Sequence, residues 1–384
     1  MATARASIRI IGRRQLAARV VLFAGLVNNL WAASPGRYPM PPESIRYDEQ
    51  IDKARTIVAE LIKAKKIPGF SIAVARGGTI VWSEGFGLAN VEQGVLVTPL
   101  TRFRLGSVSK VLTAAGIARL VEDGKLDLDT PVQRYVPDFP AKPWPITTRQ
   151  LAGHTAGIRH YDQKDFAGPL NGAPHFESVT KGLAIFANDP LLFEPGTNYS
   201  YSSYGWNLIS AVIAGASKKE FLSYMQRSFF ELLGLRSITA DHIDRIIPHR
   251  SAFYIRGEDG ALSNAPHSDN SYKWAGGGFL ANAEDLVRFG STHLQPGFFR
   301  QTTLDLLFTS QTLDSGKQTG VGIGWRTGID PNGRRILHHG GSLNGGRAML
   351  MMFPESGVVV AMLSNIRGDF GEKDAVMIGH LFIQ

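Results

Sequence analysis

A serine and a lysine three residues apart give the strongest chemical signal in this chain. Gly106 is followed by Ser107-Val108-Ser109-Lys110, where an Ala- and Leu-rich run begins. Side chains at positions i and i+3 share one face of a helix, so Lys110 can take the hydroxyl proton of Ser107 if burial or a second cation keeps the amine neutral. The spacing predicts a nucleophilic serine that needs no histidine.

The same spacing occurs a second time, in Ser178-Val179-Thr180-Lys181. Serine and lysine are common, so the tetrapeptide alone does not distinguish the two copies. The first copy opens the segment 107–122, which is apolar on several sides, as expected of a buried helix that closes near Asp123-Gly124. The second copy has no such context, and we interpret it as a chance match.

Other catalytic signatures are missing from the sequence. The nearest approach to a G-x-S-x-G elbow, residues 340–344, lacks the final glycine, which disfavours an α/β-hydrolase. Motifs for zinc proteolysis, nucleoside triphosphates and dinucleotides do not occur. With no cysteine, disulfides, thiolate metal sites and cysteine nucleophiles are excluded. His338 and His339 are neighbours on an expected strand and point to opposite faces, so we predict no metal and no cofactor.

Two further segments have the composition of a polar site. Pro195-Gly196 starts a turn that leads into clustered hydroxyls at Tyr199-Ser200-Tyr201-Ser202-Ser203. In Leu337-His338-His339-Gly340-Gly341-Ser342, two glycines follow a short strand and would let a substrate approach the backbone. Taken alone, the first also fits an ordinary Tyr/Ser loop and the second a tight sheet turn.

In this order, the three segments resemble the serine β-lactamase and penicillin-binding-protein family, in its class C and esterase-like branch. The family pattern is S-x-x-K, then Y-x-N after a Pro-Gly turn, then a K-T-G or H-x-G strand. The resemblance covers roughly residues 45 to 384, and His154-Thr155-Ala156-Gly157-Ile158 is close to the family's H-T-S-G-[IL]. Residues 157–161 look most like the mitochondrial β-lactamase-like proteins and their bacterial relatives.

The resemblance implies a two-step acyl transfer in which Ser107 attacks an ester or amide carbonyl and water releases the acyl-enzyme. Lys110 and Tyr201 would share the proton transfers. The backbone N–H groups of Ser107 and Gly341 would form the oxyanion hole. Substrate contacts are implied for Ser203, His338, His339, Gly340 and Arg347.

Two departures from the family pattern bear on the substrate, which we expect to be a small molecule or a peptide. Ser203 stands where relatives have asparagine, and His338 replaces the lysine that attracts a carboxylate. We therefore favour a neutral ester or peptide over an antibiotic, although Arg347 can restore the missing charge. The alternatives are a class C-like β-lactamase, a D-alanyl carboxypeptidase, and a non-catalytic scaffold that keeps the fold. The oligomeric state stays open.

The sequence also predicts most of the helices and strands that must position these residues. A helix is expected from Tyr47 to Lys66 and a hairpin from Phe70 to Trp82. Helices dominate the middle of the chain, with residues 208–216 and 219–232 as the better candidates. Strands are expected at 321–326, 336–339, 347–353 and 358–364, and a last helix at 374–382. The order predicts an α+β fold of the β-lactamase/transpeptidase type, with an antiparallel sheet flanked by N- and C-terminal helices. We place the sheet domain in 43–106 and 268–384, a helical insert in 107–267, and the active site between them.

The charge of the chain is concentrated at its start. The formal net charge is +8, but six arginines precede the first acidic residue, Glu43, and without residues 1–42 the chain has 35 basic and 33 acidic side chains. No basic stripe therefore points to nucleic acid. Residues 1–42, with an apolar stretch at 20–27 and Ala32-Ala33-Ser34, resemble a signal peptide. We predict export to the periplasm or the medium, with a mitochondrial presequence as the alternative and no membrane span in the mature chain.

Overall fold

The computed structural model describes residues 47–295, 297–368 and 370–383, so the expected leader, 1–42, lies outside the described residues. The first described helix is α2 (Asp48–Lys65). It has acidic residues in its first turn and lysines in its last, the order that suits the helix dipole. The helix ends at Lys66, whose φ of 50° is left-handed, just before the Pro68-Gly69 stop seen in the sequence.

Seven strands form one antiparallel sheet in the order β3-β2-β1-β12-β11-β10-β9. Their bounds are β1 Gly69–Arg76, β2 Thr79–Asn90, β3 Val95–Leu96, β9 Arg326–Ile329, β10 Arg335–Leu343, β11 Gly346–Phe353 and β12 Val358–Ser364. β1 pairs with β12, so that Phe70 lies opposite Ser364. The two ends of the described chain thus meet in the middle of the sheet, which confirms the predicted antiparallel sheet.

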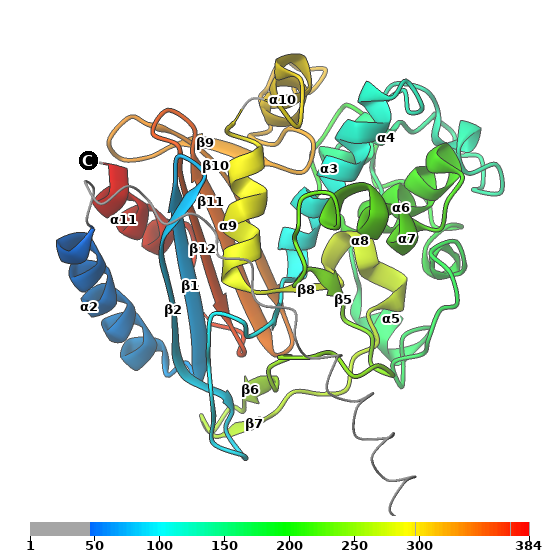
Figure 1. Cartoon of the computed structure of the whole chain (residues 1–384). Helices are drawn as coiled ribbons and strands as arrows, with labels where there is room; N and C mark the ends of the chain where they lie inside the picture. Colours follow the sequence, from blue (N-terminus) through cyan, green and yellow to red (C-terminus); the bar gives the residue numbers. More distant parts are fainter. Residues whose placement is uncertain (1–46, 296, 369, 384) are drawn as a thin grey trace, which may run out of the picture. The chain divides into compact units, whose positions relative to one another are not determined.

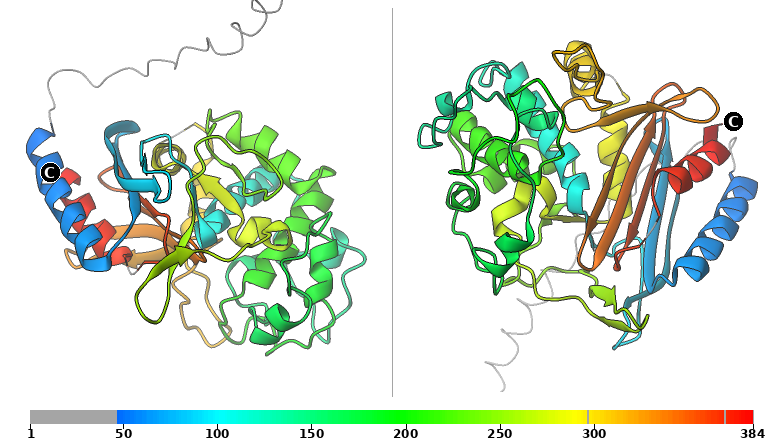
Figure 2. Two further views of the ribbon diagram at one scale, coloured as in Figure 1. Left: turned by 90° about the horizontal axis from the view of Figure 1, so that it is seen from below. Right: turned by 180° about the vertical axis from the view of Figure 1, so that it is seen from behind.

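Different helices cover the two faces of this sheet (Figure 1). On one face α2 and α11 (Glu372–Ile383) lie side by side, as both views of Figure 2 show, and on the other α9 (Ala283–Thr292) packs across β1 and β12. Residues alternate along β1: Ile72 and Val74 belong to the core under α2 and α11, whereas Ala73 and Ala75 belong to the core on the α9 side.

Short helices and turns fill the middle of the chain. These are α3 Ser109–Glu122, α4 Thr148–Ala152, α5 Gln163–Ala167, α6 Ser203–Ser217, α7 Phe221–Met225, α8 Trp274–Gly277, α10 Gln301–Phe308, and the single turns η1 Gly106–Val108, η2 Val132–Arg134, η3 Lys181–Ile185, η4 Gln226–Phe230 and η5 Ser271–Lys273. Small strands complete it: β4 Phe103–Arg104, β5 Thr239–Ala240, β6 Tyr254–Arg256, β7 Leu262–Asn264 and β8 Phe279–Ala281. Helix α3 is buried along most of its length, as its apolar sequence predicted. The boundaries of the two predicted domains stay a prediction.

Two elements differ from the sequence-based expectation. The strand predicted at 321–326 is wrong: this segment bends, and β9 begins only at Arg326. Glycines cause the bend, because Gly324 has a φ of 77° and a side chain there would meet the ring of Trp206 at 2.8 Å. The helix predicted at 219–232 is shorter, since α7 starts after its cap, Glu220, and gives way to the wider π-type turn η4.

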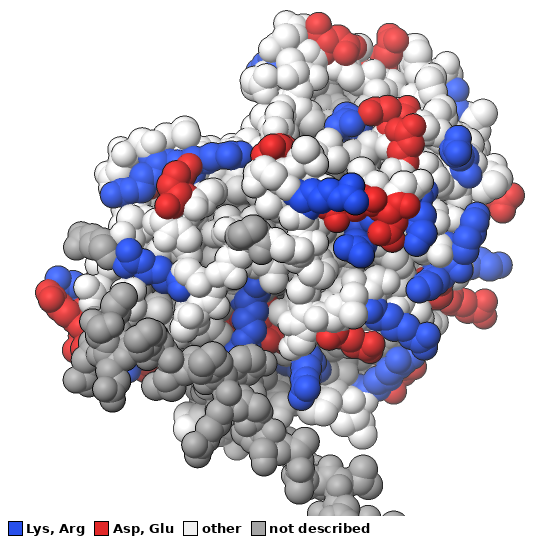
Figure 3. Space-filling model, turned by 45° about the horizontal axis from the view of Figure 1, so that its top comes forward, with Lys and Arg blue, Asp and Glu red and all other residues white. Residues whose placement is uncertain are grey.

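The surface carries both signs of charge. On the face that Figure 3 shows, lysines and arginines are interspersed with aspartates and glutamates. Within the described ranges, no helix combines the length and the apolar character that crossing a bilayer requires.

Candidate active site

Ser107 lies in η1, the turn that connects β4 to α3. The turn depends on Gly106, whose φ is +49° and whose position leaves no room for a side chain: a Cβ there would lie 2.8 Å from the backbone nitrogen of Ser342 in β10. A glycine before the serine therefore lets η1 approach the end of β10 closely. This packing places Ser107 against the sheet, partly exposed, with α3 running away behind it.

Lys110 is completely buried, with none of its surface exposed. Its ammonium group donates to the carbonyl oxygen of Gly276 at 2.7 Å, to Ser203 Oγ at 3.1 Å and to Ser107 Oγ at 3.2 Å. These three bonds use all the hydrogens of the amine. The helical i, i+3 spacing thus brings the amine to the serine.

Tyr201 reaches the same hydroxyl from another part of the chain. It precedes the N-cap of α6, Ser202, whose side chain accepts a hydrogen bond from the backbone nitrogen of Gly205. The phenol of Tyr201 donates to Ser107 Oγ at 2.8 Å. The structure therefore brings together Ser107, Lys110 and Tyr201, three residues that the sequence singled out.

The charges of Lys110 and Tyr201 depend on each other. Burial lowers the pKa of Lys110 below its usual value, while a phenolate at Tyr201 would raise it. Burial alone would raise the pKa of Tyr201, but the nearby Lys110 charge, together with the hydrogen bond between Tyr201 and Ser107, outweighs burial and lowers it. Near neutral pH a larger fraction of each group is therefore deprotonated, and able to accept a proton, than of its free counterpart, and the two titrate as a pair.

Gly341 lies beside the backbone nitrogen of Ser107. A Cβ on Gly341 would lie 3.0 Å from that nitrogen and would overlap the carbonyl oxygen of Leu105. The pairing of β9 with β10 stops at His338, which lies opposite Arg326. The last part of β10 therefore pairs only with β11, and its other edge faces η1. The two residues expected to form the oxyanion hole are thus neighbours.

The remaining predicted substrate residues lie on two sides of this centre. Ser203 is bonded to Lys110 and lines a cavity of about 570 Å³ that also includes Ser107. His338, His339, Gly340 and Arg347 line a second cavity of about 540 Å³, which includes Tyr201. The hydrogen bond between Tyr201 and Ser107 therefore joins a residue of each cavity.

His338 and His339 have different surroundings, as neighbours on a strand should. The Nε2 of His338 lies 3.5 Å from Glu372, and burial lowers the pKa of the ring although Glu372 opposes this. The Nδ1 of His339 donates to the carbonyl oxygen of Gly340 at 2.7 Å, and burial holds the pKa of His339 well below its usual value. Both rings are therefore mostly neutral at pH 7.

Positive charge in the second cavity comes from arginines. Arg347 donates from Nε to the carbonyl oxygen of Phe370 at 2.8 Å. Arg326, at the start of β9 and opposite His338, also lines this cavity. The sequence analysis did not identify Arg326 as a site residue. Its position depends on the pairing of β9 with β10, which places it opposite His338 and which the sequence does not reveal.

Two histidines hold the Tyr201 loop, and the sequence reasoning gave them no role. The Nδ1 of His154 accepts from the backbone nitrogen of Ser202 and that of His160 from the backbone nitrogen of Ser203, each at 3.1 Å. Burial and the Lys110 charge lower the pKa of His160 to about 4, which keeps Nδ1 available as an acceptor. The available signal was that both histidines flank Gly157, within the H-T-A-G-I and G-I-R-H-Y segments.

The sequence matches the family described as Beta-lactamase over residues 54–379. It is 30% identical to the serine beta-lactamase-like protein LACTB, mitochondrial, of Bos taurus, over 85% of this chain and 78% of that protein. It is 27% identical to penicillin-binding protein 4* of Bacillus subtilis, over 80% of this chain and 70% of that protein. The solved structure of EstCE1, a hydrolase with promiscuous acyltransferase activity, matches with a TM-score of 0.76 at 20% identity, over 88% of this chain and 99% of that one. At that identity the likeness to EstCE1 shows a shared fold.

Proposed function

The chain belongs to the Beta-lactamase family, and on that premise we propose that it is a serine hydrolase that cleaves an ester or amide through an acyl-enzyme on Ser107. The observation that carries the proposal is that Ser107 Oγ lies within hydrogen-bonding distance of both Tyr201, at 2.8 Å, and Lys110, at 3.2 Å. This convergence also argues against the non-catalytic scaffold, because a buried lysine is costly to maintain where it has no task.

In the acylation step, Ser107 Oγ attacks the carbonyl carbon and gives its proton to the Tyr201–Lys110 pair. When Tyr201 is ionised, its 2.8 Å contact with Ser107 reverses direction, and the phenolate accepts the proton. Lys110 stabilises that phenolate, since its charge lowers the pKa of Tyr201. Tyr201 then passes the proton to the leaving group as the bond to the carbonyl carbon breaks. A water molecule then attacks the acyl carbon and gives its proton to the Tyr201–Lys110 pair. The bond to Ser107 Oγ breaks, Ser107 takes the proton back, and the acid is released.

Negative charge on the carbonyl oxygen would be stabilised by the backbone N–H groups of Ser107 and Gly341. Each such donor contributes about 10²- to 10³-fold in rate in well-studied hydrolases. The glycines at 106 and 341 allow the two amides to approach each other. We assign the site to the boundary between the sheet domain (43–106 and 268–384) and the helical insert (107–267).

The second cavity supports a narrower alternative. Arg326 and Arg347 line it together with His338, so a substrate carboxylate would meet positive charge there although the family lysine is replaced. This favours a class C-like β-lactamase or a D-alanyl carboxypeptidase as the second candidate, after a neutral ester or peptide hydrolase. Parallel assays with a short-chain p-nitrophenyl ester, a chromogenic cephalosporin and a D-alanyl peptide distinguish the three.

The decisive test of the proposal is covalent labelling. A fluorophosphonate should add once to the wild-type protein, raise its intact mass and stop ester hydrolysis. Ser107→Ala should prevent both the adduct and the hydrolysis, whereas the matched control Ser178→Ala, in the second S-x-x-K copy, should keep both. A wild-type protein that takes up no label and cleaves none of the three substrates would rule out the hydrolase.

The location of the protein follows from residues 1–42. We propose export to the periplasm or medium, with mitochondrial import as the alternative, which gains support from the name of the Bos taurus relative. N-terminal sequencing of the mature protein, after fractionation of the cells that produce it, distinguishes the two.

A further inference from the structure

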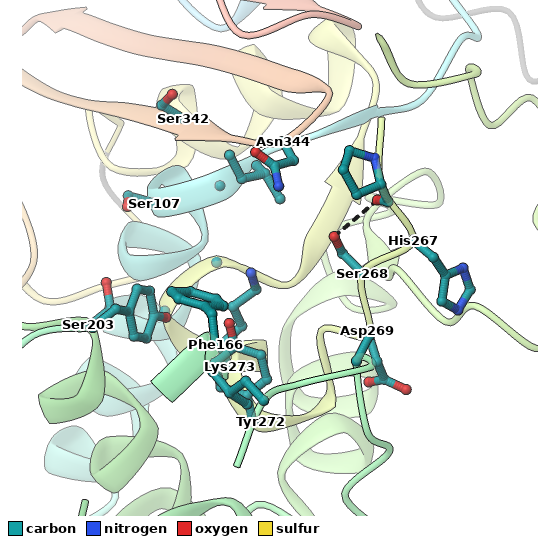
Figure 4. Close-up of a pocket in the computed structure, with 18 of the residues that line it drawn as sticks. Ser107, Phe166, Ser203, His267, Ser268, Asp269, Tyr272, Lys273, Ser342 and Asn344 are labelled. Atoms are coloured by element: carbon teal, nitrogen blue, oxygen red, sulfur yellow. Dashed lines mark hydrogen bonds between the residues drawn. The ribbon is translucent and has the colours of Figure 1, made fainter. Parts of the chain in front are cut away.

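The larger cavity contains a cation without a partner. Lys273, the last residue of η5, lines the 570 Å³ cavity together with Ser107. Within the described part of the chain its ammonium group forms no hydrogen bond and no ion pair, and the nearest aromatic contact is with the ring of Tyr272, whose centroid lies 5.1 Å from Nζ. In Figure 4 the side chain of Lys273 reaches toward the open centre of the cavity.

The carboxylates near Lys273 are already engaged by other groups. Asp241 accepts from Arg104 at 2.7 Å and from Asn270 at 3.0 Å, and Arg250 lies 3.3 Å from its other oxygen. Asp269 accepts from the backbone nitrogen of Ser271 at 2.7 Å, and its second oxygen lies 2.8 Å from the Nδ1 of His175. Both acids are therefore fixed by partners outside the cavity, and neither pairs with Lys273.

The surroundings of Lys273 destabilise its charged form. Burial lowers the pKa of Lys273 to about 8, the cations Arg104 and Lys110 lower it further, and Asp241 and Asp269 offset only part of this effect. At pH 7 the amine is still mostly protonated. An anion that entered the cavity would supply the missing partner and stabilise the ammonium form.

The rest of the cavity suits a carbon chain that ends in such an anion. Its walls include Phe166, Leu170 and Tyr272, which offer apolar surface. In Figure 4 the rings of Phe166 and Tyr272 lie beside Lys273. Arg367 is a second basic residue of the lining, and the carboxylate of Asp269, which also lines the cavity, is already bonded to Ser271 and His175. A chain attached to Ser107 can thus run along apolar walls and end at a cation.

The geometry also indicates which part of the substrate lies in the cavity that Lys273 lines. The leaving group must receive its proton from Tyr201, which lines the other cavity. The acyl chain, which stays bonded to Ser107, then occupies the cavity that holds Lys273. We propose that Lys273 selects substrates whose acyl chain carries a terminal carboxylate, such as monoesters of medium-length dicarboxylic acids. This inference rests on the proposed acyl-enzyme function and specifies its substrate class. For the acyl side it replaces the neutral ester favoured above with one that carries a negative charge.

The test compares two esters that differ only at the end of the acyl chain. One is the 4-methylumbelliferyl monoester of adipic acid, which ends in a carboxylate, and the other is the matching ester of adipamic acid, which ends in a neutral amide. At pH 7 the wild-type kcat/KM should favour the carboxylate by about tenfold or more, as for a hydrogen bond to a charged group. The preference should fade between pH 7 and 9.5, because the ammonium form of Lys273 is lost as the pH rises through about 8.

Substitutions assign the preference to Lys273. In Lys273→Met the ratio of the two kcat/KM values should fall to near one, and Lys273→Glu should reverse it in favour of an amine-terminated ester. Lys273→Arg should keep the preference and extend it to higher pH. The control Lys181→Met removes an exposed lysine from the second S-x-x-K copy and should leave the ratio unchanged.

Binding separates this inference from the proposed function. Adipate itself should bind Ser107→Ala, which cannot turn over, and should bind about tenfold more weakly when Lys273→Met is added. Equal hydrolysis of both esters by the wild-type protein, or a ratio that Lys273→Met does not change, overturns the role of Lys273 and leaves the hydrolase intact. If neither ester is cleaved but adipate binds through Lys273, the hydrolase fails and the anion site stands.

Discussion

The chain contains the same four-residue pattern twice, and the two copies differ in their surroundings. In Ser107–Lys110 the lysine is completely buried, and its amine bonds to the serine hydroxyl. In Ser178–Lys181 the lysine is exposed at the start of η3, and the hydroxyl of Ser178 pairs with Thr180 at 2.9 Å instead. Equal spacing thus gives a convergent pair in one place and a solvated turn in the other.

The difference shows what the motif requires from the rest of the fold. Lys110 is in α3, a helix enclosed by the core, so its amine has to find partners inside the protein. The first copy is also joined by Tyr201, from the loop before α6, and by Gly341 from β10, both far away in the sequence. The nucleophile is therefore a property of three packed elements, and the tetrapeptide is only the first of them.

The largest expected effect comes from removing the buried amine. Lys110→Met fills a similar volume but cannot take part in proton transfer, so kcat/KM for an ester should fall by about 10⁴-fold. Its counterpart Lys181→Met should retain wild-type activity, because that side chain is exposed. Steady-state kinetics with a p-nitrophenyl ester measure both, and thermal unfolding checks that Lys110→Met is folded. Comparable losses in the two variants would contradict our distinction between the copies.

The next largest effect concerns Tyr201, which the second copy lacks altogether. Tyr201→Phe should lower kcat/KM by about 10³-fold, because the group that exchanges protons with Ser107 is lost. The phenolate raises the pKa of Lys110, so without it the pKa of Lys110 falls. Activity that needs the neutral amine is present above that pKa and lost below it, so the alkaline rise of the residual rate should move to lower pH. A pH–rate profile of both proteins tests this direction, and a shift to higher pH would exclude the assigned coupling.

The sequence was sufficient to predict the parts of the site that have a signature among neighbouring residues. Gly106 with Ser107 and Lys110, the hydroxyl cluster at Tyr201, and the glycines of β10 each have a local signature, and the structure brings them together. The buried character of α3 follows from its hydrophobic pattern, and the joining of strands from both ends of the chain follows from the order of the elements. Both kinds of signal can be read along the chain, which is why these features could be predicted.

The features missed by the sequence depend on long-range packing. In the sequence nothing distinguishes Lys273 from the other lysines. Only the structure shows that the nearby carboxylates, Asp241 and Asp269, are bonded to other groups. The bend around Gly324 exists because the ring of Trp206 fills the space beside it. No local pattern reports such contacts, since each joins residues that are distant along the chain.

A smaller loss is expected from the close approach of η1 and β10. Gly341→Ala would place a Cβ against the carbonyl oxygen of Leu105, so either η1 or β10 has to shift and one oxyanion donor moves away. We expect kcat to fall by about 10²-fold, the effect of removing one such donor. Gly328→Ala, in the edge strand β9 of the same sheet, is the control, because its Cβ would meet Ile336 at an ordinary 3.6 Å. Rates are normalised to fluorophosphonate-labelled sites. Unchanged kcat in Gly341→Ala would remove Gly341 from the oxyanion hole.

The smallest effect is expected from the histidines that support the loop at Tyr201. In His160→Leu the backbone nitrogen of Ser203 loses its acceptor, so Tyr201 is held less firmly and kcat should fall by about tenfold, the equivalent of one hydrogen bond. His160→Gln supplies another acceptor and should recover most of this loss. KM should change little in either variant, because His160 positions Tyr201 and does not contact the substrate. If His160→Gln is as slow as His160→Leu, the ring acts through its shape against Tyr201, whose centroid lies 5.5 Å away, and the hydrogen bond to Ser203 is not what orders the loop.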